Sequence, residues 1–179
     1  MTLLRHTRPS VGADICYGIS DFDVADSFAQ DAGTVLEVLP ALDRIVTSPL
    51  LRCRRLARYI AEFRDLPVVE DSRLREMNFG TWEGRAWADI PRCEIDLWGA
   101  DFLNARPHGG ESVAAVRARA GRALAEIAQA HWRERVLIVT HAGIIRTALA
   151  TGDTAADHAA TIGFGGFVTL FPNVFRSEP

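Results

Sequence analysis

The chain has 179 residues, of which 48% are hydrophobic and 24% charged, the proportions of an ordinary soluble globular protein of one compact domain. Its net charge of −3 argues against a nucleic-acid-binding surface, which needs a basic excess. All 20 basic residues are arginine, so the chain lacks the amine that P-loop, Schiff-base and pyridoxal-phosphate enzymes require. An anion bound here meets guanidinium groups, histidine or backbone amides.

The sequence favours a cytoplasmic protein. No apolar run approaches the roughly 20 residues that span a bilayer, and the first residues do not have the pattern of a secretory signal. The three cysteines form no CxxC pair, which favours reduced thiols. We therefore expect no membrane contact and no nucleic-acid partner, and the sequence leaves both a monomer and a homodimer open.

Predicted strands and helices alternate along the chain. Apolar runs predict strands at 2–4, 44–47, 67–70, 136–140 and 167–171. Helical spacing predicts helices over 24–39, 51–63, 113–127 and 143–150. Ser48 and Pro49 predict a helix start, as does Ser112, because serine caps free amides and proline suits the first helical position. This alternation predicts one domain over 1–179, a three-layer α/β/α sandwich with a mostly parallel central sheet.

Histidine and arginine follow three of the predicted strands. Arg5 and His6 end the first strand, Arg52 comes one turn into the helix after the second, and His141 ends the fourth. Ligands of parallel α/β sheets bind beyond the carboxyl ends of the strands, and the N-termini of the following helices favour anions. The sequence therefore predicts a phosphate site at this edge of the sheet.

These side chains fit phosphoryl transfer without a metal ion. A neutral His6 can attack phosphorus and form a phosphohistidine, while Arg5 and Arg52 hold the non-bridging oxygens. His141, if protonated, would add a donor to the oxyanion. The two arginines would repel a cation, so we expect neither a metal nor a cofactor.

The reaction also needs a general acid for the leaving alkoxide. Glu76 is the candidate that we favour, and Glu83 and Glu111 remain open alternatives.

Five segments in the same order resemble the histidine phosphatase (phosphoglycerate mutase-like) superfamily. They are Leu4–Thr7, Ser48–Arg52, Leu74–Gly84, Gly109–Ser112 and Val139–Arg146. The resemblance implies a metal-independent phosphomonoesterase that acts on a small phosphorylated metabolite through a phosphohistidine on His6. It also implies a substrate-cap segment at about 77–110 and the proton-donor role for Glu76.

Within that superfamily the chain is most similar to the α-ribazole phosphatase branch of cobalamin synthesis. The similarity rests on Arg5-His6-Thr7, on Cys16-Tyr17-Gly18 and on Asp21. It implies α-ribazole 5′-phosphate as a substrate. Sugar phosphates, nucleotides, phosphohistidine proteins and a non-catalytic phospholigand-binding role stay open.

Further residues are weaker candidates for substrate binding. They are Thr7, Arg8, Tyr17, Gly18 and Trp82. The segment from Trp82 to Trp98, which holds three of the four tryptophans, is the candidate for recognition of a flat base. His131 and His158 are interpreted as structural or exposed.

Other phosphatase classes fit the sequence less well. A cysteine-based phosphatase needs an arginine six residues after its cysteine, and none of the three cysteines has one. A haloacid-dehalogenase-type site at Asp21 and Asp23 would lack both the preceding apolar strand and the lysine that such sites use.

Overall fold

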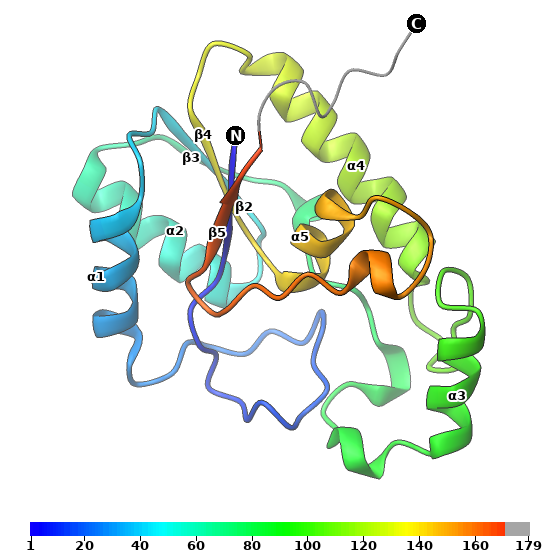
Figure 1. The fold of residues 1–179 in the computed structure, drawn as a ribbon. Helices are drawn as coiled ribbons and strands as arrows, with labels where there is room; N and C mark the ends of the chain where they lie inside the picture. The colour runs from blue at the N-terminus through cyan, green and yellow to red at the C-terminus, as the bar shows by residue number, and fades with distance from the viewer. Residues whose placement is uncertain (171–179) are drawn as a thin grey trace, which may run out of the picture.

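The computed structural model describes residues 1–170, which form a three-layer α/β/α sandwich (Figure 1). Its sheet has five strands in the order β3-β2-β4-β1-β5. The strands are β1 (Thr2–Arg5), β2 (Arg44–Thr47), β3 (Val68–Glu70), β4 (Val136–Thr140) and β5 (Phe167–Thr169). All neighbours are parallel except β1 and β5, which are antiparallel. The predicted fold class is confirmed.

The strand β4 lies at the centre of the sheet, and every one of its residues is buried. Its unbroken run of apolar residues is what a strand covered on both faces requires. Arg5 pairs with Thr140, and Thr47 pairs with Val139. This register brings the carboxyl ends of β1, β2 and β4 to one edge, so the residues that come directly after them lie together.

Two pairs of helices cover the two faces of the sheet (Figure 1). On one face α1 (Phe28–Val38) and α2 (Leu51–Arg64) pack with Leu4 and Leu137. On the other, α4 (Val113–Ala130) and α5 (Ala142–Leu149) pack with their neighbours on the strands, Leu3 and Ile138. Successive strand residues point to opposite faces, which is why adjacent leucines serve different helices. Among residues 1–170, no helix has both the length and the apolar character needed to cross a bilayer.

The segment 77–110 lies beside the sandwich rather than in it. It contains the short 3-10 turns η2 (Gly80–Trp82) and η3 (Trp87–Asp89) and the helix α3 (Arg92–Ala100). Part of it forms a small cluster built on Cys16, Trp82 and Ile90, and its Met77, Phe79 and Phe102 pack against α4 and α5. No residue of α3 is fully buried, so this helix shows little of the apolar periodicity that would predict it from sequence.

The structure corrects three predicted boundaries. The first helix begins at Phe28 rather than residue 24, because Val24 instead forms an isolated antiparallel bridge with Pro9. The helix α2 begins at Leu51, as its apolar spacing predicts, and not at Pro49, as the Ser48-Pro49 pair predicts, because Leu50 still has extended backbone angles. The final strand ends at Thr169, and residue 171 lies outside the described residues.

Candidate active site

His6 lies directly after β1 and is 2% exposed. Its Nδ1 is 2.6 Å from the carbonyl oxygen of Thr7. A carbonyl only accepts hydrogen bonds, so Nδ1 carries the proton and Nε2 keeps a lone pair. Burial, together with the charges of Arg52 and Arg5, holds the pKa of His6 well below its ordinary value. His6 is therefore a neutral imidazole with a nucleophilic Nε2.

His141 follows β4 and forms the N-cap of α5, with its ring centroid 5.2 Å from that of His6. Its Nε2 is hydrogen-bonded to the hydroxyl of Ser48 at 2.8 Å. Burial and the nearby Arg52 hold the pKa of His141 well below its ordinary value. The sequence analysis predicted that a protonated His141 would add a donor to the oxyanion. The lowered pKa disfavours this protonated form in the free protein. A neutral His141 ring carries one N–H.

Ser48 differs from its predicted use as a helix cap. Its hydroxyl accepts a long hydrogen bond of 3.4 Å from the amide of Leu50, and a shorter contact joins it to His141. The main partner of this side chain is therefore a site histidine, and the sequence prediction of a simple N-cap is wrong.

Arg52 is completely buried in the first turn of α2. Its Nε donates to Nε2 of His6 at 3.3 Å, and its two terminal nitrogens donate to the carbonyls of Ser20 and Gly18 at 2.8 and 2.7 Å. These bonds fix the plane of the guanidinium beside Nε2 of His6. They leave a second N–H on each terminal nitrogen for a phosphate oxygen.

Arg5 approaches the same point from β1. Its Nη1 donates to the carbonyl of Ile162 at 2.6 Å, and its Cζ lies 3.8 Å from the centre of the Phe164 ring. Its Nε is buried without a hydrogen-bond partner among the described residues. Buried donors are almost always paired, so an unpaired cationic donor next to His6 suits an incoming oxyanion.

Glu76 reaches the site from the loop after the 3-10 turn η1 (Ser72–Leu74). Its Oε1 accepts from the amide of Met77 and its Oε2 from the amide of Gly143, both at 3.0 Å. A Cβ added at Gly143 would lie 2.2 Å from Oε1. The glycine of the second-histidine segment thus makes room for this carboxylate, which lines the same pocket as His6.

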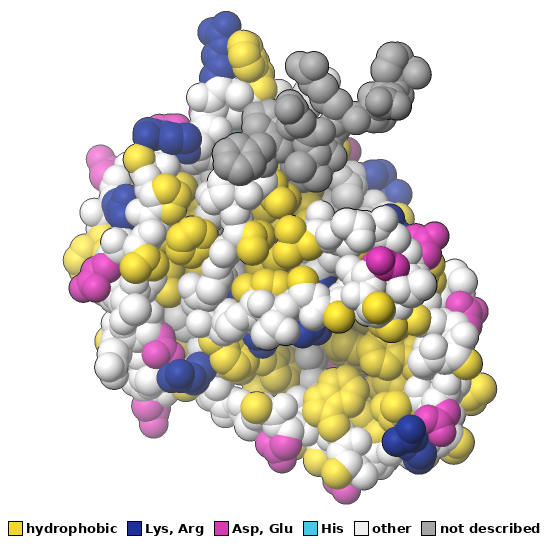
Figure 2. Space-filling model, in the orientation of Figure 1, with side chains coloured by type: hydrophobic (Ala, Val, Ile, Leu, Met, Phe, Trp, Pro, Cys, Tyr) yellow, Lys and Arg dark blue, Asp and Glu magenta, His cyan; other side chains and the backbone are white. Residues whose placement is uncertain are grey.

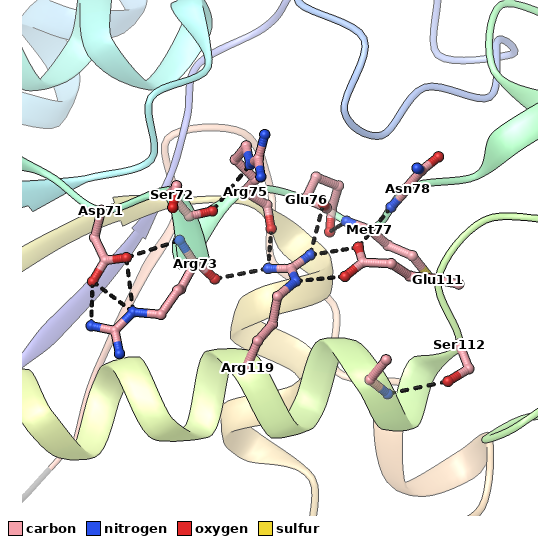
Figure 3. A network of polar contacts seen from close by, with 11 residues as sticks. Asp71, Ser72, Arg73, Arg75, Glu76, Met77, Asn78, Glu111, Ser112 and Arg119 are labelled. Atoms are coloured by element: carbon pink, nitrogen blue, oxygen red, sulfur yellow. Dashed lines mark hydrogen bonds and ion pairs between the residues drawn. The ribbon is translucent and has the colours of Figure 1, made fainter.

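Arg119 of α4 holds the backbone that carries Glu76 (Figure 3). It donates to the carbonyls of Arg73, Arg75 and Glu76 at 2.8, 2.7 and 3.0 Å. It also forms a bidentate pair with Glu111 at 2.7 and 2.8 Å. No sequence pattern predicted a role for Arg119, because nothing in a helical pattern shows which loop an arginine will reach.

The two alternative acids have other partners. Glu111 is bound by Arg119 and by the amide of Asn78. Burial alone would raise the pKa of Glu111, but these hydrogen bonds outweigh it and hold that pKa below its ordinary value. Glu83 accepts from the amides of Ile19, Ser20 and Phe79. Neither carboxylate lines the pocket, whereas Glu76 does.

The helix N-termini at the site are occupied by the protein's own carboxylates. Asp21 accepts from the amide of Leu51 at the start of α2, and Glu76 accepts from Gly143 at the start of α5. The expectation that these amides would bind phosphate is therefore wrong for Leu51 and Gly143. The arginines and histidines remain as candidates for anion binding.

The pocket at this site has a volume of about 460 Å³, and its lining includes Arg5, His6 and Glu76 but not Arg52 or His141. Figure 2 shows a hollow with hydrophobic side chains on this face of the molecule. Six aromatic side chains line the pocket: Tyr17, Phe79, Trp87, Trp98, Phe102 and Phe164. Of these, only Tyr17 was a sequence candidate. Arg146 also lines the pocket, and its position inside the second-histidine segment was a signal that could have identified it.

The other weak candidates lie away from the pocket wall. Arg8 is exposed and pairs with Asp31 at 3.4 Å. Thr7 is buried and its hydroxyl has no hydrogen-bond partner among the described residues. Gly18 packs so tightly that an added Cβ would lie 1.8 Å from the carbonyl oxygen of Met77. Its contribution is the carbonyl that holds Arg52.

Trp82 is also not where it was expected. Its side chain is completely buried, and its indole donates to Glu94 at 2.6 Å. It supports the segment 77–110 from within, while Trp87 and Trp98 present their rings to the pocket. Two tryptophans of the predicted segment thus line the pocket and Trp82 does not, and recognition of a flat base by this segment stays a prediction.

The chain matches a family of known proteins over most of its length. The model of the histidine phosphatase superfamily (branch 1) matches residues 1–160. Phosphoserine phosphatase 1 of Hydrogenobacter thermophilus is 31% identical over 151 residues, which cover 79% of this chain and 70% of that enzyme. Adenosylcobalamin/α-ribazole phosphatase of Salmonella typhimurium is 33% identical over 125 residues, which cover 68% of this chain and 61% of that enzyme. The chain thus matches about three fifths of the length of this second relative.

A solved structure shares the same fold. The mycobacterial glucosyl-3-phosphoglycerate phosphatase is 27% identical, with a TM-score of 0.81, and the match covers 93% of this chain and 87% of that one.

Proposed function

Because the chain belongs to the histidine phosphatase superfamily, we propose that it hydrolyses a phosphomonoester through a phosphohistidine on Nε2 of His6. The observation that carries the proposal is the state of His6 itself. Its Nδ1 proton is fixed by Thr7, its pKa is lowered, and its Nε2 lies beside the buried guanidinium of Arg52. A histidine that only packed against a strand or capped its end would need neither a fixed tautomer, nor a lowered pKa, nor a buried guanidinium beside Nε2.

The first step forms a nitrogen–phosphorus bond. The lone pair of Nε2 attacks phosphorus while the bond from phosphorus to the leaving oxygen breaks. Arg5 and Arg52 compensate the charge on the non-bridging oxygens, and the N–H of a neutral His141 adds a third contact. Glu76 in its acid form gives its proton to the leaving oxygen, so an alcohol departs.

The second step reverses these roles. The carboxylate of Glu76 takes a proton from water, and the oxygen of that water attacks phosphorus. The nitrogen–phosphorus bond breaks, inorganic phosphate leaves, and His6 is neutral again. Glu76 suits both steps because two backbone amides hold its carboxyl group in one orientation.

For the leaving group we propose a molecule with a flat apolar ring, held against the substrate-cap segment 77–110. The aromatic side chains of that segment, Phe79, Trp87, Trp98 and Phe102, line the pocket. α-Ribazole 5′-phosphate has such a ring, and one of the relatives that the chain resembles is an adenosylcobalamin/α-ribazole phosphatase. These two facts support it as the substrate.

A second candidate is the phosphate ester of a small hydroxy acid. Arg146 lines the pocket, and no ion pair joins it to a carboxylate within residues 1–170. A free guanidinium suits a substrate carboxylate, and another relative is a phosphoserine phosphatase.

The experiment measures phosphate release in the presence of a chelator from α-ribazole 5′-phosphate, phosphoserine, 3-phosphoglycerate and p-nitrophenyl phosphate. H6A is the blank, and H131A is the matched control. We expect release with wild type and H131A but not with H6A, and an acid-labile phosphoenzyme at His6 after rapid quenching. A kcat/KM for α-ribazole 5′-phosphate well above the other esters supports that substrate. Equal turnover by H6A would overturn the mechanism, and loss of turnover in chelator would overturn metal independence.

A further inference from the structure

His158 lies in the 3-10 turn η4 (Ala156–His158), which connects α5 to β5, and it was expected from sequence to be structural or exposed. It is 5% exposed, and its ring lies 5.3 Å from that of Phe102. Both side chains line the pocket that contains His6 and Glu76. The residue is therefore part of the wall that a leaving group would meet.

The hydrogen bonding of His158 leaves one nitrogen unused. Its Nδ1 lies 3.1 Å from the carbonyl oxygen of Thr154. Because a carbonyl can only accept, Nδ1 carries a proton, and in the neutral form of the ring Nε2 is then an acceptor. This Nε2 is buried and has no hydrogen-bond partner within residues 1–170. A buried acceptor left unpaired costs free energy that a ligand donor would recover.

An unused donor lies in the same wall. The indole Nε1 of Trp98 is buried without a partner among the described residues. The Trp98 ring contacts the same Phe102 ring, at a centroid distance of 5.8 Å. The wall thus holds one unpaired acceptor and one unpaired donor, and a hydroxyl can pair with either because it both donates and accepts.

We propose that His158 is a specificity-determining residue whose Nε2 accepts a hydrogen bond from a hydroxyl group on the leaving group. The inference rests on the proposed phosphomonoesterase function and names its substrate class: phosphate esters of polyols, sugars or nucleosides. A carboxylate at this position would place its lone pairs against that of Nε2. The acidic end of a hydroxy-acid ester therefore does not fit here.

The test compares each alkyl phosphate in a series of chain lengths with the ω-hydroxyalkyl and ω-carboxyalkyl phosphates of the same length. The series is needed because a flexible chain must be long enough to reach from His6 to His158. The measured quantity is the ratio of kcat/KM for the hydroxylated ester to kcat/KM for the plain ester. In wild type this ratio should rise about fivefold to tenfold at the fitting length, the effect of one net hydrogen bond.

Two variants of His158 separate recognition from structure. H158N keeps a donor near the Nδ1 position for Thr154 but removes the acceptor at Nε2, so the ratio of kcat/KM for hydroxylated over plain esters should no longer rise at the fitting length. H158Q places an amide oxygen near Nε2 and should restore part of the preference. A purely structural role would lower the rates for all esters together and leave the ratio unchanged.

Tryptophan variants test the donor. W98F removes the indole N–H and keeps an aromatic ring, and it should reduce the hydroxyl preference. W87F is the matched control, because Trp87 lines the same pocket and its nitrogen is not a buried unpaired donor. A W98F variant with the full preference would overturn the choice of a hydroxyl.

The remaining outcomes are decisive. The same ratio in wild type and H158N at every chain length would overturn the proposal, as would a His158-dependent preference for the carboxylated esters. If the protein hydrolyses neither these esters nor p-nitrophenyl phosphate, the proposed phosphomonoesterase function itself is overturned. The plain alkyl phosphates detect that outcome separately from the role of His158.

Discussion

The Nε of Arg52 donates a hydrogen bond of 3.3 Å to Nε2 of His6, the nitrogen that we propose as the nucleophile. The same guanidinium charge lowers the pKa of that histidine, after the larger effect of burial. Arg52 therefore keeps Nε2 unprotonated and occupies its lone pair until phosphate arrives. One side chain both prepares the nucleophile and offers donors to the oxyanion.

Replacement of Arg52 should affect both the binding of the oxyanion and the pKa of His6. In R52K a single ammonium cannot reach His6, Gly18 and Ser20 with the fork geometry of a guanidinium. We expect kcat/KM to fall about 10²- to 10³-fold, the usual effect of losing an oxyanion donor. In R52M, where the charge is gone, the pKa of His6 should also rise, as followed by NMR titration of the ring. An unchanged pKa of His6 in R52M would contradict the claim that the charge of Arg52 lowers this pKa. R55M, on the exposed side of the same helix, is the control.

Replacement of Glu76 should depend on the leaving group. E76Q keeps the size of the side chain but cannot give a proton. Alkyl phosphates, whose alkoxides leave poorly, should lose about 10²- to 10⁴-fold in kcat, and aryl phosphates with good leaving groups much less. The measurement is kcat for butyl phosphate against p-nitrophenyl phosphate. Equal losses on both would place the acid elsewhere, and E83Q and E111Q would then be compared in the same assay.

Arg119 should act as a positioning residue for that acid. R119L removes the three backbone contacts that hold the segment before Glu76, so the carboxyl group should lose its fixed orientation. We expect a lower kcat on alkyl phosphates, by about tenfold or more, with little change in KM and a smaller effect on p-nitrophenyl phosphate.

The neighbouring Arg117 provides the control for that experiment. It lies on the same helix but pairs with the exposed Asp153, so R117L should leave both substrates unaffected. A parallel fall in kcat for alkyl and aryl esters in R119L would indicate loss of structure instead of misplacement of the acid. Thermal unfolding of both variants measures that loss directly.

The buried histidines should make stability fall in mild acid. The pKa of His6 in the folded protein lies well below the ordinary value of 6.5, because burial and then Arg52 disfavour its charged form. Below about pH 6.5 the unfolded chain therefore binds more protons than the folded one, so the free energy of unfolding decreases as the pH falls. Above that pH this contribution to stability is fully present. His141 acts in the same direction.

Urea unfolding at a series of pH values measures this effect. The difference in the free energy of unfolding between neutral and mildly acidic pH should be smaller in H6N than in wild type. H131N, changed at the C-cap of α4, is the matched control. An equal loss of stability in H6N and wild type would show that His6 does not contribute.

The sequence by itself determined the sheet and the residues placed at the ends of its strands. The apolar run 136–140 could only be a covered strand, and the register of parallel strands then brought Arg5, His6 and His141 to one edge. Glu76 was reached through its place in a segment that resembles a known family. These inferences depend on contacts between residues close in sequence or on a fixed strand period, which a sequence displays directly.

Only the tertiary structure decided which side chains use which partners. Trp82 and Trp98 lie in the same segment, yet Trp82 is buried with its indole hydrogen-bonded to Glu94, whereas Trp98 lines the pocket. Arg119 contacts the backbone of Glu76, and His158 lines the pocket of His6, in each case from a distant part of the chain. Such pairings depend on how loops and helices pack around the sheet, where no local period exists. The physical reason is that partner choice is set by packing over long sequence separations, whereas strands and helices are set largely by local patterns.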